Sequence, residues 1–398
     1  MTSTASLTTG AGTRIHGLDS LRAVALGLGI VLHSLMPFHP GAGAWMFSDG
    51  QSSPVAQELV NGIHLFRMVL FMALAGYFGR MVLHRRGAGS YLRDRLLRIG
   101  LPAVAFWPFA VASTGVVIGI AAALQGWEPP ALAPQGEAID PLLLLSPGHL
   151  WFLLVLLQCV VLTLLARAVL LRALGRERGR RIAERIGAAL ASPAGVLLAA
   201  VPYTAGLLLQ ESIAGGLREP VTVLPTPSSL TAYLGAFLVG WFLHARPGSL
   251  QALARQWPWL LGAAAVLLVA ASLLQGGSLP PLLHAPVLAV AGWATAYALL
   301  AVSVRFLHRE SPAMRYLADA SYWSYLMHLP IVLALGLALA GLDWPIAVKL
   351  LVTWAGTAVL LLVPYDLFVR STWIGRWLNG RRRPRALRLG RRRVDPLA

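Results

Sequence analysis

The sequence has 398 residues, of which 57% are hydrophobic and 12% are charged. Soluble proteins usually carry about 25% charged residues, so this composition excludes an ordinary soluble domain and predicts an all-α integral membrane protein in a lipid bilayer. The formal net charge of +17 does not indicate a nucleic-acid partner. The basic residues gather between apolar segments, where membrane proteins carry them in cytoplasmic loops.

Apolar segments of helical length follow one another along most of the chain. The opening residues lack the basic start and apolar run of a cleavable signal peptide, so we expect 1–17 to be a cytoplasmic N-terminal segment. A membrane domain over 18–368 and a basic cytoplasmic tail over 369–398 follow it, and we expect 381–398 of this tail to be disordered. The membrane domain is predicted to hold about ten transmembrane helices, at 18–37, 62–83, 98–124, 149–171, 192–210, 229–245, 257–275, 284–306, 320–340 and 345–368.

The arginines assign a side of the membrane to each connection. The connections 84–97 and 172–185 are rich in arginine, as is the tail over 370–393. The connections 38–61 and 125–148 are acidic or neutral. Because basic loops stay in the cytoplasm, this alternation predicts a multi-pass protein of the bacterial inner membrane with both termini cytoplasmic.

The first apolar helix carries three ionisable residues, Asp19, Arg22 and His33. Eleven steps of about 100° place Arg22 and His33 within about 20° of one helix face, separated by about 16 Å of rise. Such a stripe is costly in lipid unless it faces protein or water. Histidine titrates near neutrality, so His33 could take a proton from an alcohol and return it. The plainer interpretation is a snorkelling helix end followed by a packed histidine.

Further polar residues occur in three of the other predicted helices. His149 and Trp151, which open the fourth predicted helix, could instead belong to the aromatic belt at the membrane interface. Gly76 could instead serve plain helix packing. The candidates for a pocket are His64, Arg67, Gly76, His149, Trp151, Tyr325 and His328.

Several well-known motifs are missing from the sequence. It contains no Gly-rich phosphate loop, no HExxH metal-ligand spacing and no GxSxG nucleophile elbow. We therefore expect neither a metal nor a bound cofactor, and nucleotide hydrolysis has no support.

Taken together, these pieces resemble the membrane-bound acyltransferase family often called acyltransferase three. Its signature is an arginine, ten residues and a histidine in the first helix, which here are Arg22 and His33. A phenylalanine-rich element ending in Ser-Gly corresponds to 71–76, where Ala75 replaces the serine. The other elements are a basic run leading into a proline at 91–102, His-Leu-Trp-Phe-Leu at 149–153, and Ser-Tyr to His-Leu-Pro at 321–330.

This resemblance implies an O-acyltransferase that takes its acyl group from a cytoplasmic acyl-CoA, succinyl-CoA or acetyl-CoA. Within the family, the chain most resembles the succinyltransferases of periplasmic glucans, which act in osmoregulated glucan biosynthesis. His33 would then be the general base on the acceptor hydroxyl, with Asp19 and Arg22 holding the polar stripe. Phosphates of the donor need cationic contacts, for which the cytoplasmic side offers Arg93, Arg95 and Arg98.

Two alternatives stay open at this point. Within the same family, the chain could be an O-acetyltransferase of lipopolysaccharide or another surface glycan. A proton-coupled solute transporter could also use intramembrane Asp, Arg and His residues as a relay. The sequence shows no internal repeat, which weakens a transporter built from inverted repeats.

Overall fold

The computed structural model describes residues 16–40, 46–126, 145–274, 279–307, 309 and 311–386, and its regular structure there is entirely helical. This confirms the all-α prediction. The elements in chain order are α1 (His16–Leu35), η1 (Met36–Phe38), α2 (Pro54–Arg86), α3 (Ala88–Arg95), η3 (Leu96–Gly100), α4 (Leu101–Gln125), η4 (Gly148–Leu150), α6 (Trp151–Leu190), α7 (Gly195–Leu208), α8 (Pro227–Ala245), α9 (Ser249–Arg255), α10 (Trp257–Leu274), α11 (Pro281–Phe306), α12 (Pro312–Leu339), α13 (Ile346–Pro364), η5 (Tyr365–Val369) and α14 (Trp373–Asn379).

Nine helices among the described residues are long and apolar enough to cross a membrane. They lie at nine of the ten predicted positions. The remaining predicted position, 192–210, is held by α7. Its 14 residues are fewer than the roughly 20 that a perpendicular crossing needs. The protein is therefore an integral membrane protein, while the number of crossings and the side of each terminus remain predictions.

Two segments that we expected to be loops, 84–97 and 172–185, are mostly helical instead. Most of 84–97 forms α3. The segment 172–185 belongs to α6, which continues beyond Gly175 in a new direction. Gly175 has φ 77° and ψ 162°, a conformation that only glycine adopts readily. Arginine is a good helix former, and side-chain pairs four residues apart, such as Glu177 with Arg181 (3.1 Å), support the extension.

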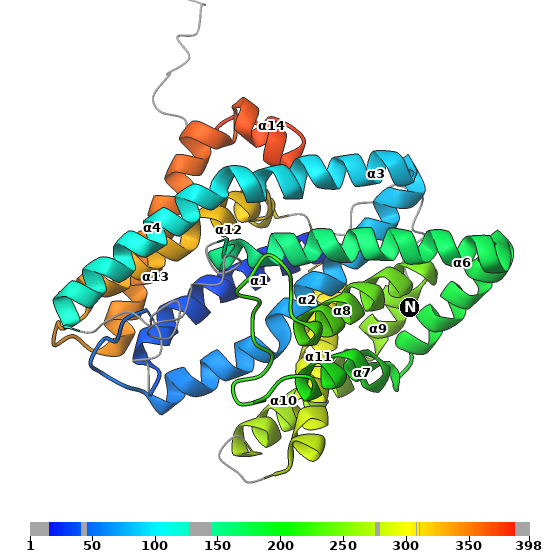
Figure 1. Ribbon diagram of the computed structural model, residues 1–398, viewed down its shortest axis with the longest axis horizontal. Helices are drawn as coiled ribbons and strands as arrows, with labels where there is room; N and C mark the ends of the chain where they lie inside the picture. The colour runs from blue at the N-terminus through cyan, green and yellow to red at the C-terminus, as the bar shows by residue number, and fades with distance from the viewer. Residues whose placement is uncertain are drawn as a thin grey trace, which may run out of the picture.

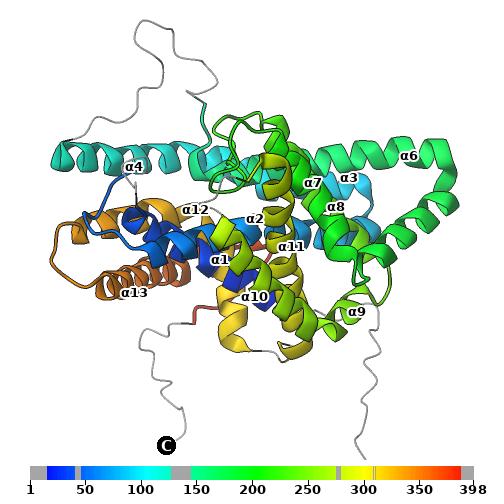
Figure 2. The same ribbon diagram turned by 90° about the horizontal axis from the view of Figure 1, so that it is seen from below.

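The helices α2 and α11 form the centre of the bundle, and α4 and α10 lie at its edge. In the most apolar stretch of α2 and of α11, 72% of the residues are buried, against 11% for the run 88–125 that contains α4 and 17% for α10. Small residues, mostly alanine, line the buried face of α11 and let neighbouring backbones approach closely. The helix α11 contacts α2 and α7, and Figure 2 shows α4 extending away from these helices.

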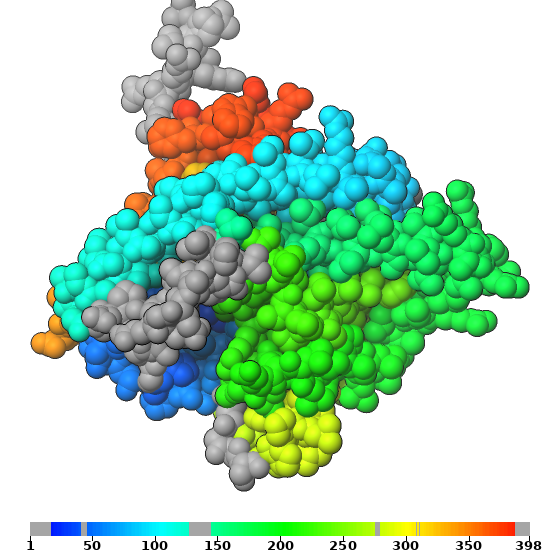
Figure 3. Space-filling view, in the orientation of Figure 1, coloured from blue at the N-terminus to red at the C-terminus, as the bar shows by residue number. Residues whose placement is uncertain are grey.

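The C-terminal segment is docked on the bundle as far as residue 386. The short helix α14 lies on the junction between α3 and α4 (Figures 1 and 3). There the Trp377 Nε1 donates a hydrogen bond to the Leu97 carbonyl oxygen at 2.8 Å. Arg383 meets the buried carboxylate of Asp319 at 2.6 Å. The expectation of disorder is therefore wrong for 381–386, because Arg383 has a buried partner there, and 387–398 lies outside the described residues.

Candidate active site

The helix α1 lies among other helices, as its polar stripe requires. It contacts α2, α11, α12 and α13. Asp19 and Arg22 are half-buried near its start, and both have interaction partners. His33 is also half-buried, near the other end of the helix. The stripe therefore belongs to the interior of a helix bundle, although His33 stands about three turns from Arg22.

Three of the predicted histidines come together from three elements. The ring of His33 on α1 lies 5.4 Å, centre to centre, from the ring of His328 on α12. The ring of His328 lies 5.5 Å from that of His149 on η4. The residues form a row with His328 in the middle. The sequence separates its members by up to 295 positions, so only the packing of α1, α12 and η4 creates it.

Backbone hydrogen bonds fix the orientation of two of these rings. The Nδ1 of His328 lies 2.8 Å from the Tyr325 carbonyl oxygen, and the Nε2 of His149 lies 3.2 Å from that of Leu326. Because a carbonyl oxygen only accepts, both nitrogens must carry hydrogen. In the neutral rings the opposite nitrogens are then acceptors. Tyr325 also donates its hydroxyl to the His149 carbonyl oxygen at 2.6 Å, which ties α12 to η4 a second time.

Arg67 brings a buried positive charge to the same region. Its side chain comes from α2, the residue is 6% exposed, and its guanidinium lies beside Gly29 of α1. A Cβ on Gly29 would lie 2.9 Å from the Arg67 Nη1, so glycine makes room for the guanidinium. Gly29 stands one turn before His33 on the same helix face. The Arg67 Nε has no hydrogen-bond partner among the described residues.

The remaining pocket candidates occupy different surroundings. His64 binds the Leu217 carbonyl oxygen at 2.9 Å and lies 4.0 Å from Glu219, both in the connection before α8. Trp151 packs against Tyr233 of α8 with 5.3 Å between ring centres.

Gly76 lies where α2 crosses α8. A Cβ there would collide with the Phe237 carbonyl oxygen and lie 3.1 Å from the Trp241 backbone nitrogen. Gly76 therefore makes a close helix contact possible, which is the packing alternative that the sequence left open.

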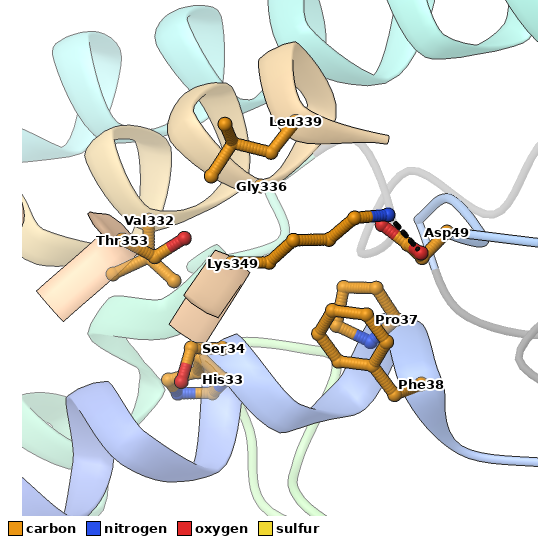
Figure 4. Close-up of a pocket in the computed structure, with 10 residues that line it drawn as sticks. All are labelled: His33, Ser34, Pro37, Phe38, Asp49, Val332, Gly336, Leu339, Lys349 and Thr353. Atoms are coloured by element: carbon orange, nitrogen blue, oxygen red, sulfur yellow. Dashed lines mark hydrogen bonds and ion pairs between the residues drawn. The ribbon is translucent and has the colours of Figure 1, made fainter. Parts of the chain in front are cut away.

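A pocket opens beside His33, between the ends of α1, α12 and α13 (Figure 4). It encloses about 270 Å³ of empty space, counted with the part that is open to solvent. One wall carries an ion pair between Lys349 and Asp49, with 2.6 Å between Nζ and Oδ1 and both side chains 2% exposed. Sequence reasoning passed over both residues. The available signal was that Lys349 is the single lysine of the chain and stands within an apolar helix.

Three basic residues in and beside the segment predicted to be cytoplasmic surround one acid that the sequence analysis did not single out. The Asp94 carboxylate lies 3.0 Å from Arg98 and 3.5 Å from each of Arg95 and Arg86. Arg93 is exposed. The structure therefore brings two of the three predicted donor-binding arginines together on Asp94.

Tyr322 connects this cluster to the histidines. Its hydroxyl donates to the Arg98 carbonyl oxygen at 2.6 Å. Tyr322 precedes His328 by six residues on α12, which is about 9 Å along the helix axis.

No group of three or more His, Cys, Asp or Glu residues that could hold a metal ion occurs in the described part of the chain. The histidine row is a set of packed rings, two of which are held by backbone carbonyls. Side chains of this kind are suited to proton transfer and hydrogen bonding in a protein interior.

Comparison with known proteins gives a match to one family and to several curated relatives. The sequence model of a family described as acyltransferase domain matches residues 15–369. Curated relatives include proteins named glucans biosynthesis protein C, from Escherichia coli (strain K12) at 29% identity and from Shigella boydii serotype 4 (strain Sb227) at 28% identity, each over 153 residues. The match spans 38% of this chain and 38% of the length of each relative. No solved structure matches the chain.

Proposed function

We propose a specific reaction for this chain, which belongs to the acyltransferase domain family and is a membrane acyltransferase: the transfer of a succinyl group from cytoplasmic succinyl-CoA to a hydroxyl of a periplasmic glucan. The family match over 15–369 covers the helices that build the histidine row. The names of the curated relatives refer to glucans. The acyl group, the acyl-CoA donor and the location in the inner membrane are parts of this proposal.

One observation carries the proposal: helix α12 links three polar regions in a line. Tyr322 contacts the basic cluster around Asp94, His328 stands about 9 Å further along the helix, and Gly336 lines the pocket about 12 Å beyond that. By the topology deduced from the arginines, the line runs from the cytoplasm outward. This order suits a reaction whose donor and acceptor arrive from opposite sides of the membrane.

His33 is the general base of the proposed reaction. It receives the proton of the acceptor hydroxyl while the hydroxyl oxygen bonds to the thioester carbonyl carbon. Collapse of the tetrahedral intermediate breaks the carbon–sulfur bond, and His33 returns the proton to the sulfur, so that an ester and CoA thiol are formed. The close ring of His328, whose Nδ1 hydrogen is fixed by a backbone carbonyl, positions the His33 imidazole. General bases typically contribute about 10²–10⁴-fold in rate.

The charged residues of α1 have supporting roles. Asp19 and Arg22 lie half-buried toward the donor end of the helix. There they hold the polar stripe and help to bind the donor. Arg95 and Arg98 contact the phosphates of CoA, which charge-assisted hydrogen bonds to arginine stabilise, and the exposed Arg93 extends this surface.

Arg67 supports a succinyl rather than an acetyl group. A buried guanidinium with an unpartnered Nε is costly unless an anion accompanies it. A succinyl thioester carries a carboxylate three bonds beyond its carbonyl carbon, and an acetyl thioester has none. With the carbonyl carbon near His33, that carboxylate can reach the guanidinium beside Gly29, one helical turn away.

Mass spectrometry of envelope glycans tests the proposal. A deletion strain should lack the mass of one succinyl group on its periplasmic glucans, and expression of the wild-type chain should restore it. Loss of an acetyl mass from lipopolysaccharide or another surface glycan would identify the acetyltransferase alternative instead. Unchanged glycans would contradict both and favour the proton-coupled transporter.

A further inference from the structure

We infer that the C-terminal segment 373–386, which begins with α14, forms one side of the acyl-CoA binding site, and that Gly380 is a positioning residue for the Arg98 guanidinium there. This inference rests on the proposed function, in which Arg98 contacts the phosphates of CoA. It adds a second wall to the donor site and a residue that acts through the arginine.

Gly380 lies directly against the end of the Arg98 side chain. A Cβ at this position would collide with the Arg98 Nη1 and lie 2.7 Å from Cζ. Gly380 also ends α14 in the left-handed conformation, with φ 78° and ψ 0°, which glycine adopts at no steric cost. Glycine therefore serves two purposes here: it lets α14 end, and it leaves the room that the guanidinium occupies.

Arg98 is held in a way that leaves most of its donors for a ligand. Its Nε meets the Asp94 carboxylate at 3.0 Å, and its side chain is 35% exposed. The Nη groups carry four of the five N–H donors. They lie beside Gly380, which has no side chain to occupy them. Donors in this planar fork match the oxygens of a phosphate.

The segment is docked more specifically than a topological anchor requires. Trp377 Nε1 donates to the Leu97 carbonyl oxygen at 2.8 Å, and the side-chain amide of Asn379 donates to that of Asp319 at 2.9 Å. Arg383 meets the Asp319 carboxylate at 2.6 Å. A basic tail needs only its charge to stay in the cytoplasm, not a defined place on the bundle. These contacts instead fix the end of α14 against α12 and η3 (Figure 3).

The backbone of Arg98 is fixed as well. The element η3 is a single π-helical turn between α3 and α4, a form that is frequent at functional sites. Its Leu97 carbonyl oxygen accepts from Trp377, and its Arg98 carbonyl oxygen accepts the Tyr322 hydroxyl at 2.6 Å. The helices α14 and α12 therefore hold η3 from two directions. Such preorganisation lowers the cost of binding a ligand.

A side chain at position 380 should move Arg98 rather than open the bundle. The atoms in its way are the far end of a flexible side chain, which can turn aside. The guanidinium would then lose its place at the phosphates. Gly248 provides the matched control, because it has φ 79° and ψ 2° and a Cβ there meets nothing within 4 Å. Gly248→Ala therefore introduces the same backbone strain without the collision.

Equilibrium binding of CoA to the full-length protein in lipid nanodiscs tests the inference. CoA carries the phosphates of the donor and no acyl group, so the result does not depend on which acyl group is transferred. Gly380→Ala should raise the Kd for CoA about tenfold, since one charge-assisted contact is worth about that much or more. Gly248→Ala should stay within about twofold of the wild type, and the two variants should unfold at similar temperatures.

A double-mutant cycle distinguishes positioning of Arg98 from a general structural effect. In an Arg98→Gln background, Gly380→Ala should change the Kd by less than about twofold, because the guanidinium that it displaces is gone. If Gly380→Ala fails to fold, Gly380→Asn and Gly248→Asn replace the pair of variants. Asparagine enters the left-handed region more readily than alanine, so the collision is then tested with less backbone strain.

Four results would overturn the inference. Equal Kd values for the variants of Gly380 and Gly248 would show that the segment is not part of the donor site. Equal losses with and without Arg98 would show that Gly380 does not act through it. A lower Kd for Gly380→Ala would mean that the segment obstructs the site. Absence of CoA binding by the wild-type protein would contradict the donor of the proposed function, and the inference with it.

Discussion

Substitution of Arg67 should separate the two acyl donors. Arg67→Gln removes a buried charge and keeps a polar side chain. No internal hydrogen bond of Nε is lost, since that atom has no partner among the described residues. The space beside Gly29 accommodates the shorter side chain without a collision. Comparing the two donors in this variant therefore separates the ligand contact from a general effect on packing.

The expected size of the effect follows from the proposed contact. A hydrogen bond to a charged group contributes about 1.5–3 kcal/mol, and about 1.4 kcal/mol corresponds to a factor of ten. For succinyl-CoA, kcat/KM should fall about 10- to 150-fold. For acetyl-CoA, which offers no carboxylate, it should change by less than about threefold. Arg67→Lys keeps the charge without the planar fork and should recover part of the succinyl activity.

The assay is acyl transfer by the purified protein in nanodiscs, with each donor in parallel. Arg80→Gln is the matched control, because Arg80 lies on the same helix and should affect both donors alike if it affects either. Equal losses with succinyl-CoA and acetyl-CoA in Arg67→Gln would refute the reasoning. Arg67 would then act on a part that both donors share.

Three further predictions concern packing, donor binding and topology. Gly76→Ala should destabilise the protein by about 1–3 kcal/mol or more, because the added Cβ meets backbone of α8. Gly115→Ala on α4, where a Cβ meets nothing within 4 Å, should be neutral or slightly stabilising, and equal unfolding temperatures of the two variants would contradict the packing role. Substitution of Arg93, Arg95 and Arg98 by glutamine should raise the acyl-CoA Kd about tenfold or more while the protein still inserts. An unchanged Kd in a direct binding assay would leave these arginines a purely topological role. A reporter that is active only in the periplasm, fused after residue 398, should give no signal, and a strong signal would overturn the predicted topology.

The sequence predicted the polar residues of the site better than their arrangement. Ionisable groups within apolar helices are costly in lipid, which is why His33, Arg67 and His328 could be recognised without a structure. Which of them meet depends on helix packing between distant parts of the chain. The sequence could not predict that His328 stands between His33 and His149.

The residues that sequence reasoning missed share one property: each interacts with partners that only the structure identifies. Lys349 and Asp49 are 300 positions apart, and neither belongs to a motif. In the sequence Asp94 is one acid among several arginines. The structure places three of them, Arg86, Arg95 and Arg98, around its carboxylate. The basic segments were assigned to loops because charge indicates the side of the membrane, but charge does not exclude a helix outside it.

The rate of acyl transfer by His33→Gln is the most direct test of the central claim. Glutamine keeps much of the size and hydrogen bonding of histidine but cannot act as a base near neutral pH. With purified protein, succinyl-CoA and a glucan acceptor, we predict a fall of about 10²–10⁴-fold in rate with an unchanged unfolding temperature. A near wild-type rate would show that His33 is structural and would contradict the proposed mechanism.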